Sequence, residues 1–257
     1  MDHTELQALL DLKYDQFNKP GFIEDDPVSI PHMFRKKEDI EISAFLSAVI
    51  AWGRRVMIIK NANRLVEMMD MAPHDFILNA SEHDMEPLTS FVHRTFNGED
   101  CLALIQALRR VYQDFGGLEN IFSSAIKPSD DTVYEGIEHA RSVLLATEGF
   151  PARTYKHVAS PARGSAAKRI NMFLRWMVRN DGRGVDFGIW KNIASSQLIC
   201  PLDVHTGNVA RKLGLLERKQ NDWKAALELT TNLRKFSAED PVKYDFSLFG
   251  LGVFEAF

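Results

Sequence analysis

The sequence predicts a protein built almost entirely of α-helices. Apolar residues recur at three-and-four spacing in segment after segment, and hardly any stretch alternates apolar and polar residues as a half-buried strand does. The length of 257 residues is enough to bury a substantial core. We therefore expect one compact all-helical domain over residues 1–257. A soft lobe division is expected near residues 149–151, with the N-terminal residues packing on either lobe.

Five segments before residue 150 have helical spacing. Residues that stop helices separate them: Pro20 and Gly21 follow the first segment, Gly53 divides the second from the third, and Gly116 and Gly117 follow the fourth. The predicted helices are Glu5–Phe17, Asp39–Trp52, Arg54–Met71, Cys101–Phe115 and Thr132–Leu145.

Three further helices are predicted in the C-terminal half. One spans Ala167–Asn180. A second begins after Asp203, which has the position and residue type of an N-cap, and ends before Gly214. The last begins at Asp240, an expected N-cap followed by Pro241 at the first helical position.

The cysteines and the start of the chain indicate a reducing, cytoplasmic compartment. Cys101 and Cys200 lie far apart without a Cys-x-x-Cys pattern, so we expect free thiols, no zinc site and no iron–sulfur cluster. The acidic start from Met1 to Glu5 is unlike a secretory signal. No apolar stretch reaches the roughly 20 residues of a membrane span, so no membrane contact is expected.

Charge is unevenly distributed along the chain. The formal net charge of -4 argues mildly against a nucleic-acid partner. Between Arg153 and Arg183, however, eight lysines and arginines stand against one acid, Asp181, which leaves about −11 for the rest of the chain. Such segregation is typical of a phosphate-facing surface on an otherwise acidic protein.

The predicted helix Ala167–Asn180 has an apolar face and a cationic face. At about 100° per residue, Lys168, Arg175 and Arg179 fall within about 40° of one another, opposite the apolar residues. A solvated surface is the ordinary explanation of such a stripe. Because solvated faces usually mix signs, the lack of acidic residues at three-and-four spacing favours contact with phosphates instead.

Asp203 is explained structurally as an N-cap, but its surroundings also resemble a known family. The run Pro201–His205 and the helix that follows it to Leu215 resemble the proline-x-aspartate-threonine-histidine segment of the helix-hairpin-helix DNA glycosylases, a base-excision-repair superfamily. In that family the aspartate supports cleavage of the glycosidic bond, and bifunctional members add a lysine nucleophile. The resemblance assigns these catalytic roles to Asp203 and Lys168. The long gap between them is similar to that of an archaeal branch that excises oxidised guanine.

Other segments extend the resemblance to about half of the chain. Asp39–Arg64 resembles the helix–loop–helix that presents a base-probing loop, whose residues here are Trp52, Gly53 and Arg54. Asp240–Gly252 is similar to the helix that closes the catalytic lobe.

The hairpin of the family, leucine-proline-glycine-x-glycine, corresponds to Ser160–Ser165, which retains Pro161 and Gly164. Glycines in such a hairpin let backbone N–H groups approach a phosphate closely. Besides the probing loop, the resemblance and the basic stripe imply nucleic-acid contacts from Arg163, Gly164, Ser165, Arg169, Arg175, Arg179 and His205.

The resemblance implies a two-lobed helical glycosylase fold with a cleft between the lobes, and damaged duplex DNA as the partner. An oxidised base would be flipped out of the stack. The carboxylate of Asp203 would stabilise the cationic sugar, and the amine of Lys168 would attack the anomeric carbon to form a Schiff base. This chemistry needs no metal and no cofactor.

Two other classes of function stay open. A non-catalytic, helical nucleic-acid-binding module of the same fold would keep the basic helix and use Asp203 purely as a cap. A metal-dependent hydrolase would need a His/Asp cluster, but His93, His157, Asp203 and His205 have no recognisable ligand spacing. An assay for cleavage of damaged DNA distinguishes the enzyme, which would cut it, from the non-catalytic module, which would only bind it.

Overall fold

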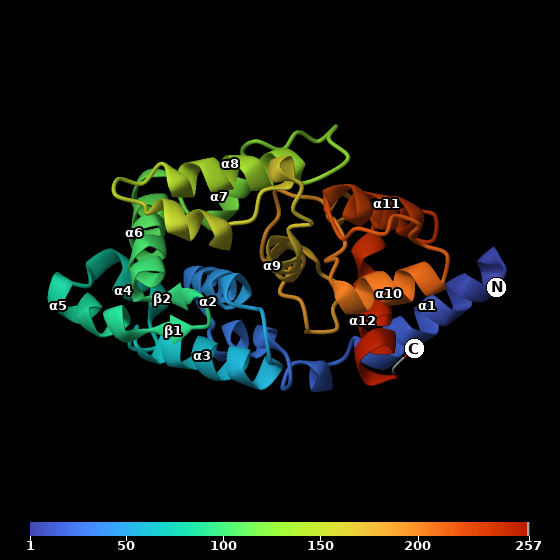
Figure 1. The fold of residues 1–257 in the computed structure, drawn as a ribbon, viewed down its shortest axis with the longest axis horizontal. Helices are drawn as coiled ribbons and strands as arrows, with labels where there is room; N and C mark the ends of the chain where they lie inside the picture. The colour runs from blue at the N-terminus through green and yellow to red at the C-terminus, as the bar shows by residue number, and fades with distance from the viewer. Residues whose placement is uncertain (256) are drawn as a thin grey trace. The chain divides into compact units, whose positions relative to one another are not determined.

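The computed structural model describes residues 1–255 and 257, and it is largely helical, as the sequence predicts (Figure 1). The chain forms two compact units. Unit 1 comprises Met1–Phe22, Lys127–Tyr134 and Ser160–Phe257, and unit 2 comprises Ile23–Ile126 and Glu135–Ala159. Residues 149–151, where the sequence indicates a soft division, lie inside unit 2, and the chain passes into unit 1 after Ala159.

Unit 1 holds the segments that carry the predicted catalytic residues. Its α-helices are α1 (His3–Phe17), α9 (Lys168–Val178), α10 (Val204–Lys212), α11 (Trp223–Arg234) and α12 (Asp245–Phe254). Short 3-10 turns join them: η1 (Pro20–Phe22), η6 (Pro161–Arg163), η7 (Ser195–Gln197) and η8 (Pro241–Tyr244).

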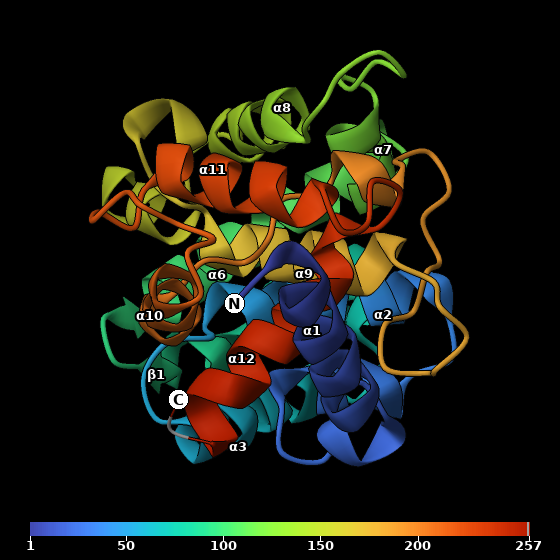
Figure 2. The ribbon, with the colours of Figure 1, turned by 90° about the vertical axis from the view of Figure 1, so that its right-hand side faces the viewer.

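The core of unit 1 forms where α12 packs against α1 and α10; α1 and α12 lie side by side in Figure 2. Every residue of α9 from Ile170 to Val178 is buried. Trp176 has no exposed surface, and Phe173 meets Trp190 edge-on with 5.3 Å between ring centroids. Beyond its first turn, α9 is therefore an interior helix.

Unit 2 is helical apart from a short antiparallel hairpin. Its helices are α2 (Lys37–Val49), α3 (Arg55–Glu67), α4 (Pro73–Asn79), α5 (Glu82–Met85), α6 (Gly98–Asp114), α7 (Leu118–Ser123) and α8 (Tyr134–Leu145), the last of which starts at the unit boundary. The 3-10 turns are η2 (Pro27–Ser29), η3 (Pro31–Met33), η4 (Glu86–Ser90) and η5 (Ala152–His157). The hairpin pairs β1 (Val92–His93) with β2 (Phe96–Asn97).

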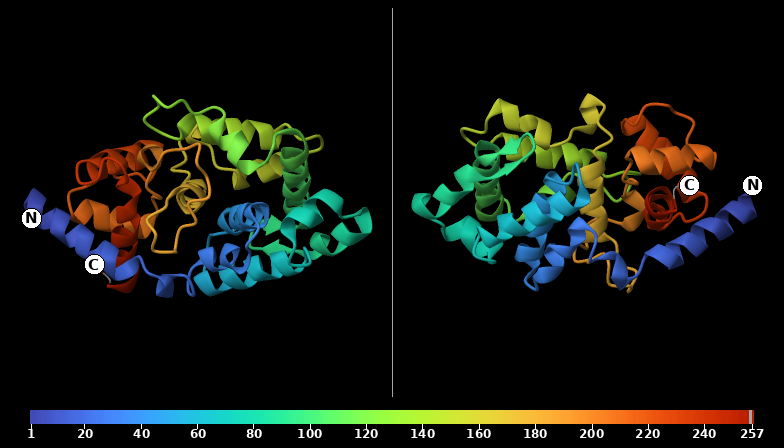
Figure 3. Two further views of the ribbon diagram at one scale, coloured as in Figure 1. Left: turned by 180° about the vertical axis from the view of Figure 1, so that it is seen from behind. Right: turned by 60° about the horizontal axis from the view of Figure 1, so that its bottom comes forward.

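In unit 2, α2 packs against α3 and α4, and α4 packs against α6; Figure 3 shows these helices from two further sides. α2 is buried along its length from Ile40 to Val49, as its apolar sequence predicts. α3 ends earlier than expected, because Asp70 and Met71 adopt positive φ angles of 54° and 52°, which a helix cannot contain.

All eight predicted helices are present within a few residues of their expected ends, whereas α11 and the short helices α4, α5 and α7 were not predicted. α11 has an N-cap of its own, since the carboxylate of Asp222 accepts a hydrogen bond from the backbone N–H of Ala225 at 3.0 Å.

The predicted capping role of Asp240 is wrong. The turn η8 stands between Asp240 and α12, and the Asp240 side chain makes no capping bond to the described residues. Its carboxylate instead accepts two hydrogen bonds from Nε of Arg179, at 3.0 and 2.9 Å. A charge-assisted bond to a buried guanidinium is stronger than a bond to a backbone N–H, so the distant partner outcompetes the local one.

Candidate active site

Lys168 is the first residue of α9 and the member of the cationic stripe that keeps contact with solvent. The side chain is 28 % exposed, and its amine lies 3.5 Å from the sulfur of Met172, one turn further along α9. The turn before it is tight: Ala167 has φ +48°, and the amide of Asn171 donates to the Ala166 carbonyl at 3.0 Å. This link holds the start of α9 in place.

Asp203 is the N-cap of α10, as predicted. Its Oδ1 accepts a hydrogen bond from the N–H of Thr206 at 3.0 Å, and its carbonyl oxygen accepts one from the N–H of Gly207 at 2.9 Å. The same carbonyl accepts a second bond from the amide of Asn221 at 3.1 Å. Backbone and side chain are both anchored, so Asp203 is held in a fixed orientation.

The structure brings Lys168 and Asp203 together. Nζ of Lys168 lies 3.9 Å from Oδ2 of Asp203, and the two side chains are 28 % and 27 % exposed. One oxygen of Asp203 caps the helix while the other faces the amine. An amine beside a fixed carboxylate, both reachable from solvent, is an arrangement that suits nucleophilic attack with stabilisation of a cationic centre.

The predicted hairpin residues lie immediately before Lys168 in the sequence. Arg163, Gly164 and Ser165 are exposed. Gly164 ends η6 with φ +82°, a conformation that favours glycine. Its carbonyl accepts a hydrogen bond from the N–H of Trp223 at 3.2 Å, and Ser165 forms an isolated bridge with Asp222. The loop is thus attached to the start of α11 while its outer surface stays accessible.

The exposed cationic face predicted for α9 does not form. Arg175 and Arg179 are 4 % and 1 % exposed, so neither is accessible to a phosphate in this structure. Arg169 is partly buried, and burial lowers its pKa to about 10. The stripe lacks acidic partners along α9 because its partners come from the loop after α9 and from segments further along the chain.

Arg175 and Arg179 are the centre of a buried ion-pair network. Nε of Arg175 donates to Asp186 at 3.2 Å, and its Nη1 donates to Asp245 at 2.5 Å. Arg179 donates to Asp186 at 2.9 Å and to Asp240, and it lies 2.9 Å from Asp181. These pairs satisfy charges that would otherwise be very costly to bury.

The N-terminal helix contributes to the same network. The hydroxyl of Tyr14 accepts a hydrogen bond from Arg179 at 2.8 Å and donates one to Asp181 at 2.7 Å. Burial opposes the ionisation of Asp181, but the bonds from Tyr14 and the Arg183 N–H, with the charge of Arg179, outweigh it and lower its pKa to about 2. This end of α9 is therefore closed by several fixed bonds.

Asp186 and Asp245 were not recognised in the sequence. Both stand between large apolar residues, in Val185-Asp186-Phe187 and in Tyr244-Asp245-Phe246. A lone carboxylate inside an apolar run indicates a buried charge that needs a cationic partner. That signal, set beside arginines that have no acidic residue at three-and-four spacing on their own helix, could have indicated an internal network.

His205 and Cys200 are close to Asp203 in the sequence, whereas Cys101 lies in unit 2. His205 is exposed in the first turn of α10. Cys101 and Cys200 are free and buried, as expected, and burial raises the pKa of the Cys101 thiol to about 12 and that of Cys200 well above its usual value. Neither thiol is activated as a nucleophile.

Trp52, Gly53 and Arg54 form the loop between α2 and α3 in unit 2, as the helix–loop–helix prediction requires. Gly53 and Arg54 are exposed, and Gly53 has φ +104°. The ring of Trp52 is half-buried and stacks on His157 with 5.4 Å between centroids. His93 meets the same ring edge-on. One face of Trp52 is thus already covered within unit 2.

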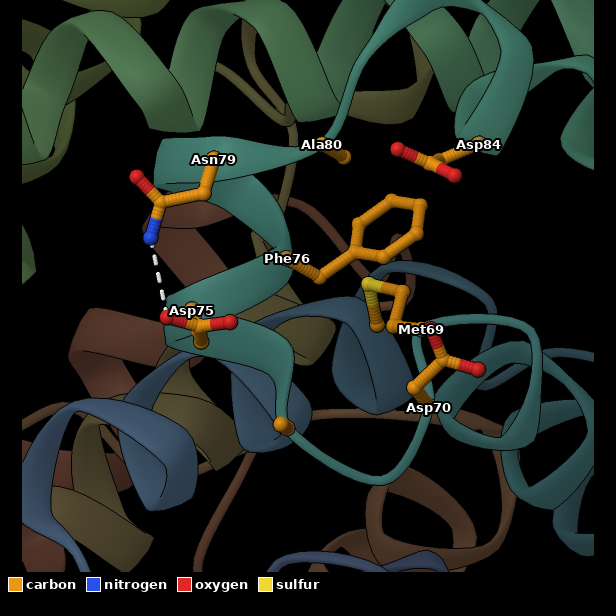
Figure 4. Close-up of a pocket in the computed structure, with 8 residues that line it drawn as sticks. Met69, Asp70, Asp75, Phe76, Asn79, Ala80 and Asp84 are labelled. Carbon is orange, nitrogen blue, oxygen red and sulfur yellow. Dashed lines mark hydrogen bonds between the residues drawn. The ribbon is translucent and has the colours of Figure 1, made fainter.

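A separate pocket in unit 2 lies among acidic residues (Figure 4). It has a volume of about 200 Å³ and contains none of the residues that the sequence singled out. Asp75 accepts a hydrogen bond from Asn79 at 2.9 Å, and Asp84 accepts bonds from the N–H and hydroxyl of Ser81. These two carboxylates are therefore engaged in local helix contacts.

In the part of the chain that the structure describes, no helix has both the length and the apolar character needed to cross a bilayer. The fold and the site together define a helical protein in which a lysine–aspartate pair opens to solvent at the starts of two helices. The chain belongs to the family described as protein of unknown function DUF2400, whose model matches residues 26–254. The match contains the whole pair and leaves α1 outside it. Comparison with curated proteins and with solved structures found no match.

Proposed function

We propose that this protein binds damaged duplex DNA and removes an oxidised base as a DNA glycosylase with lyase activity. The observation that carries the proposal is the 3.9 Å approach of the Lys168 amine to the Asp203 carboxylate in unit 1. The two residues are far apart in sequence, and each stands at the N-terminal end of a helix, accessible to a substrate. The proposal equates the two compact units with the two lobes of the helix-hairpin-helix glycosylases.

The chemistry follows from the two side chains. As the bond between the base and the sugar breaks, its electron pair leaves with the base, which takes up a proton, and the fixed carboxylate of Asp203 stabilises the cationic sugar. The amine of Lys168 bonds to the anomeric carbon, loses its protons and yields a Schiff base after ring opening. Loss of a proton from the neighbouring carbon then expels the 3′ phosphate and cuts the strand.

The surroundings of the pair suit a phosphate-bearing partner. Arg163 and His205 are exposed near the starts of α9 and α10. The N–H groups of Gly164 and Ser165 already donate to the carbonyls of Pro161 and Ser160, at 2.8 and 3.2 Å, so side chains supply the proposed contacts. Phosphate contacts of this kind position a strand without reading its sequence. The buried Arg175 and Arg179 have no part in this binding surface.

Borohydride trapping tests the proposal. The reagent reduces a Schiff base to a stable bond, so wild-type protein is expected to form a covalent adduct with a duplex that carries 8-oxoguanine or an abasic site. Lys168→Gln should abolish the adduct, and Asp203→Asn should reduce base release at least ~100-fold while it keeps a capping side chain. Lys224→Gln, which removes an exposed cation from α11, is the matched control and should trap like wild type.

The same experiment judges the alternative, a non-catalytic nucleic-acid-binding module. Salt-sensitive binding to duplex DNA without cleavage or trapping on any lesion would overturn the enzyme and favour the module, in which Asp203 is only a cap. If the protein shows no salt-sensitive DNA binding at all, both proposals are wrong.

A further inference from the structure

Asn221 is an exposed residue in the loop before α11, and the proposed chemistry does not use it. Its amide nitrogen donates a hydrogen bond to the carbonyl oxygen of Asp203 at 3.1 Å. Its amide oxygen accepts a hydrogen bond from Nη2 of Arg211, on α10, at 2.6 Å. The Asn221 side chain is thus held at both ends, and one end holds the backbone of the proposed catalytic carboxylate.

Gly207, inside α10, leaves room for this amide. A Cβ at Gly207 would lie 2.9 Å from Oδ1 of Asn221 and 2.8 Å from Nη1 of Arg211. Glycine weakens a helix interior, because its backbone loses more conformational freedom on folding than that of other residues. The glycine at this buried position is therefore explained by the two side chains that pack against it.

Arg211 attaches the loop that carries Asn221 to α10. Its Nε and Nη2 donate to the carbonyl of Arg218 at 2.9 and 2.7 Å, and Nη2 also donates to the carbonyl of Lys219 at 3.0 Å. A planar guanidinium holds its acceptors in a defined geometry. The position of Asn221 is therefore set by more than its own two hydrogen bonds.

The same loop is attached to the segment that leads into α9. Asp222 forms an isolated bridge with Ser165, and the N–H of Trp223 donates to the carbonyl of Gly164 at 3.2 Å. Residues 221–223 therefore contact both sides of the candidate active site: the segment before the proposed nucleophile, and the residue that supplies the carboxylate.

We propose that Asn221 is a positioning residue for Asp203: its amide ties Asp203 to the loop that also holds the start of α9, and so sets how the carboxylate approaches the Lys168 amine. This inference rests on the proposed function for its catalytic meaning. Without the Asn221 bond, the carbonyl of Asp203 keeps its bond from the Gly207 N–H, so α10 still forms while its N-cap gains freedom.

The first test is the rate of 8-oxoguanine release in single turnovers at saturating DNA. Asn221→Asp removes the donor to Asp203 and keeps the oxygen that accepts from Arg211. It should slow release about 10-fold, because a misplaced catalytic group reacts less often. In the Asp203→Asn background it should have no further effect, because Asn221 acts through the carboxylate. Gln220→Glu adds the same charge at the neighbouring exposed position and should release the base like wild type.

The second test needs no DNA. Hydrogen exchange of the Thr206 N–H, followed by nuclear magnetic resonance, reports on its bond to the Asp203 carboxylate. Asn221→Asp should speed this exchange about 3-fold, and Gln220→Glu should leave it unchanged. Gly207→Ala displaces the Asn221 amide with a methyl group while it favours the helix, so it should speed the exchange although α10 itself is not weakened.

Wild-type exchange in a folded Asn221→Asp variant overturns the positioning role, and so does an equal loss of base release with and without the Asp203 carboxylate. Where Asn221→Asp does not fold, wild-type exchange in Gly207→Ala overturns it instead. If wild type releases no base while the exchange changes are present, the proposed function is wrong and the link between Asn221 and Asp203 stands.

Discussion

The two ends of α9 present cations on the same helix face and place them in opposite surroundings. At the C-terminal end, Arg175 and Arg179 are buried, and their donor nitrogens lie 2.5–3.2 Å from carboxylate oxygens. At the N-terminal end, Lys168 is partly exposed and lies 3.9 Å from Asp203. The cations at the C-terminal end are buried and paired at short range, whereas the cation at the N-terminal end is accessible to solvent.

The difference follows from the cost of desolvating a charge. A buried guanidinium must be paired at close range, so the C-terminal end is committed to holding unit 1 together. A partly exposed amine keeps much of its hydration and has no need of a tight partner, so its pairing with a carboxylate contributes little to stability. The N-terminal end is therefore the one whose charged side chains remain partly accessible to solvent.

The largest expected effect comes from removing a buried cation at the C-terminal end of α9. Arg179→Met leaves the carboxylates of Asp181, Asp186 and Asp240 without their central cation, so the free energy of unfolding should fall by about 3–5 kcal/mol. Urea unfolding followed by circular dichroism measures the loss. Arg179→Lys keeps the charge but not the planar fork, and it should recover only part of it. A loss under about 1 kcal/mol for Arg179→Met would mean that the ion pairs of Arg179 do not stabilise the folded protein as proposed.

Asp181 gives a smaller effect with a defined pH dependence. Its pKa is about 2 in the folded protein and 3.8 in the unfolded chain, so its contribution is present above pH 3.8 and is lost as the pH falls through about 2. Asp181→Asn should cost about 1–2 kcal/mol at pH 7, a cost that shrinks between pH 4 and pH 2. Asp15→Asn, at an exposed ion pair with Arg183, is the control and should show no such change. A cost that is independent of pH would argue against this account.

Two substitutions of Asp203, beside the N-terminal end of α9, distinguish the stability contributed by its capping bond from that contributed by its charge. Asp203→Ala removes the bond to the Thr206 N–H and should lower the free energy of unfolding by about 1 kcal/mol. Asp203→Asn keeps a capping oxygen and should stay within about 0.5 kcal/mol of wild type. Thermal unfolding of the two variants side by side measures the difference. If both lose the same amount, the charge rather than the cap stabilises this position.

The smallest effect is expected at Lys168. Because its pairing with Asp203 is long and partly exposed, Lys168→Gln should change the free energy of unfolding by no more than about 0.5 kcal/mol, measured by urea unfolding. A loss of several kcal/mol would place Lys168 with the structural cations and remove the contrast between the two ends of α9.

Local features of the site were predictable from the sequence. The spacing of Ile170 and Phe173 indicates α9, and the residue type and position of Asp203 indicate the start of α10. Gly53 correctly marked the break between α2 and α3. These features depend on backbone conformation and hydrogen bonds within a few residues, which short stretches of sequence specify well.

The fate of the charges was not predictable in the same way. Arg175 and Arg179 were predicted to contact phosphates because α9 offers them no acidic neighbour, and Asp240 was predicted to be a cap because proline follows it. In the folded protein these residues bind one another across 61 positions of sequence, between Arg179 and Asp240. Helical periodicity separates apolar from charged faces, but it does not say whether a charged face meets water or another segment.

The sequence by itself thus determined eight of the helices, the Asp203 cap and the break at Gly53, because each depends on neighbouring residues. Only the tertiary structure decided which cations of α9 are buried with carboxylates and which one remains open beside Asp203. That decision depends on desolvation, which is known only when the chain segments that exclude water have come together.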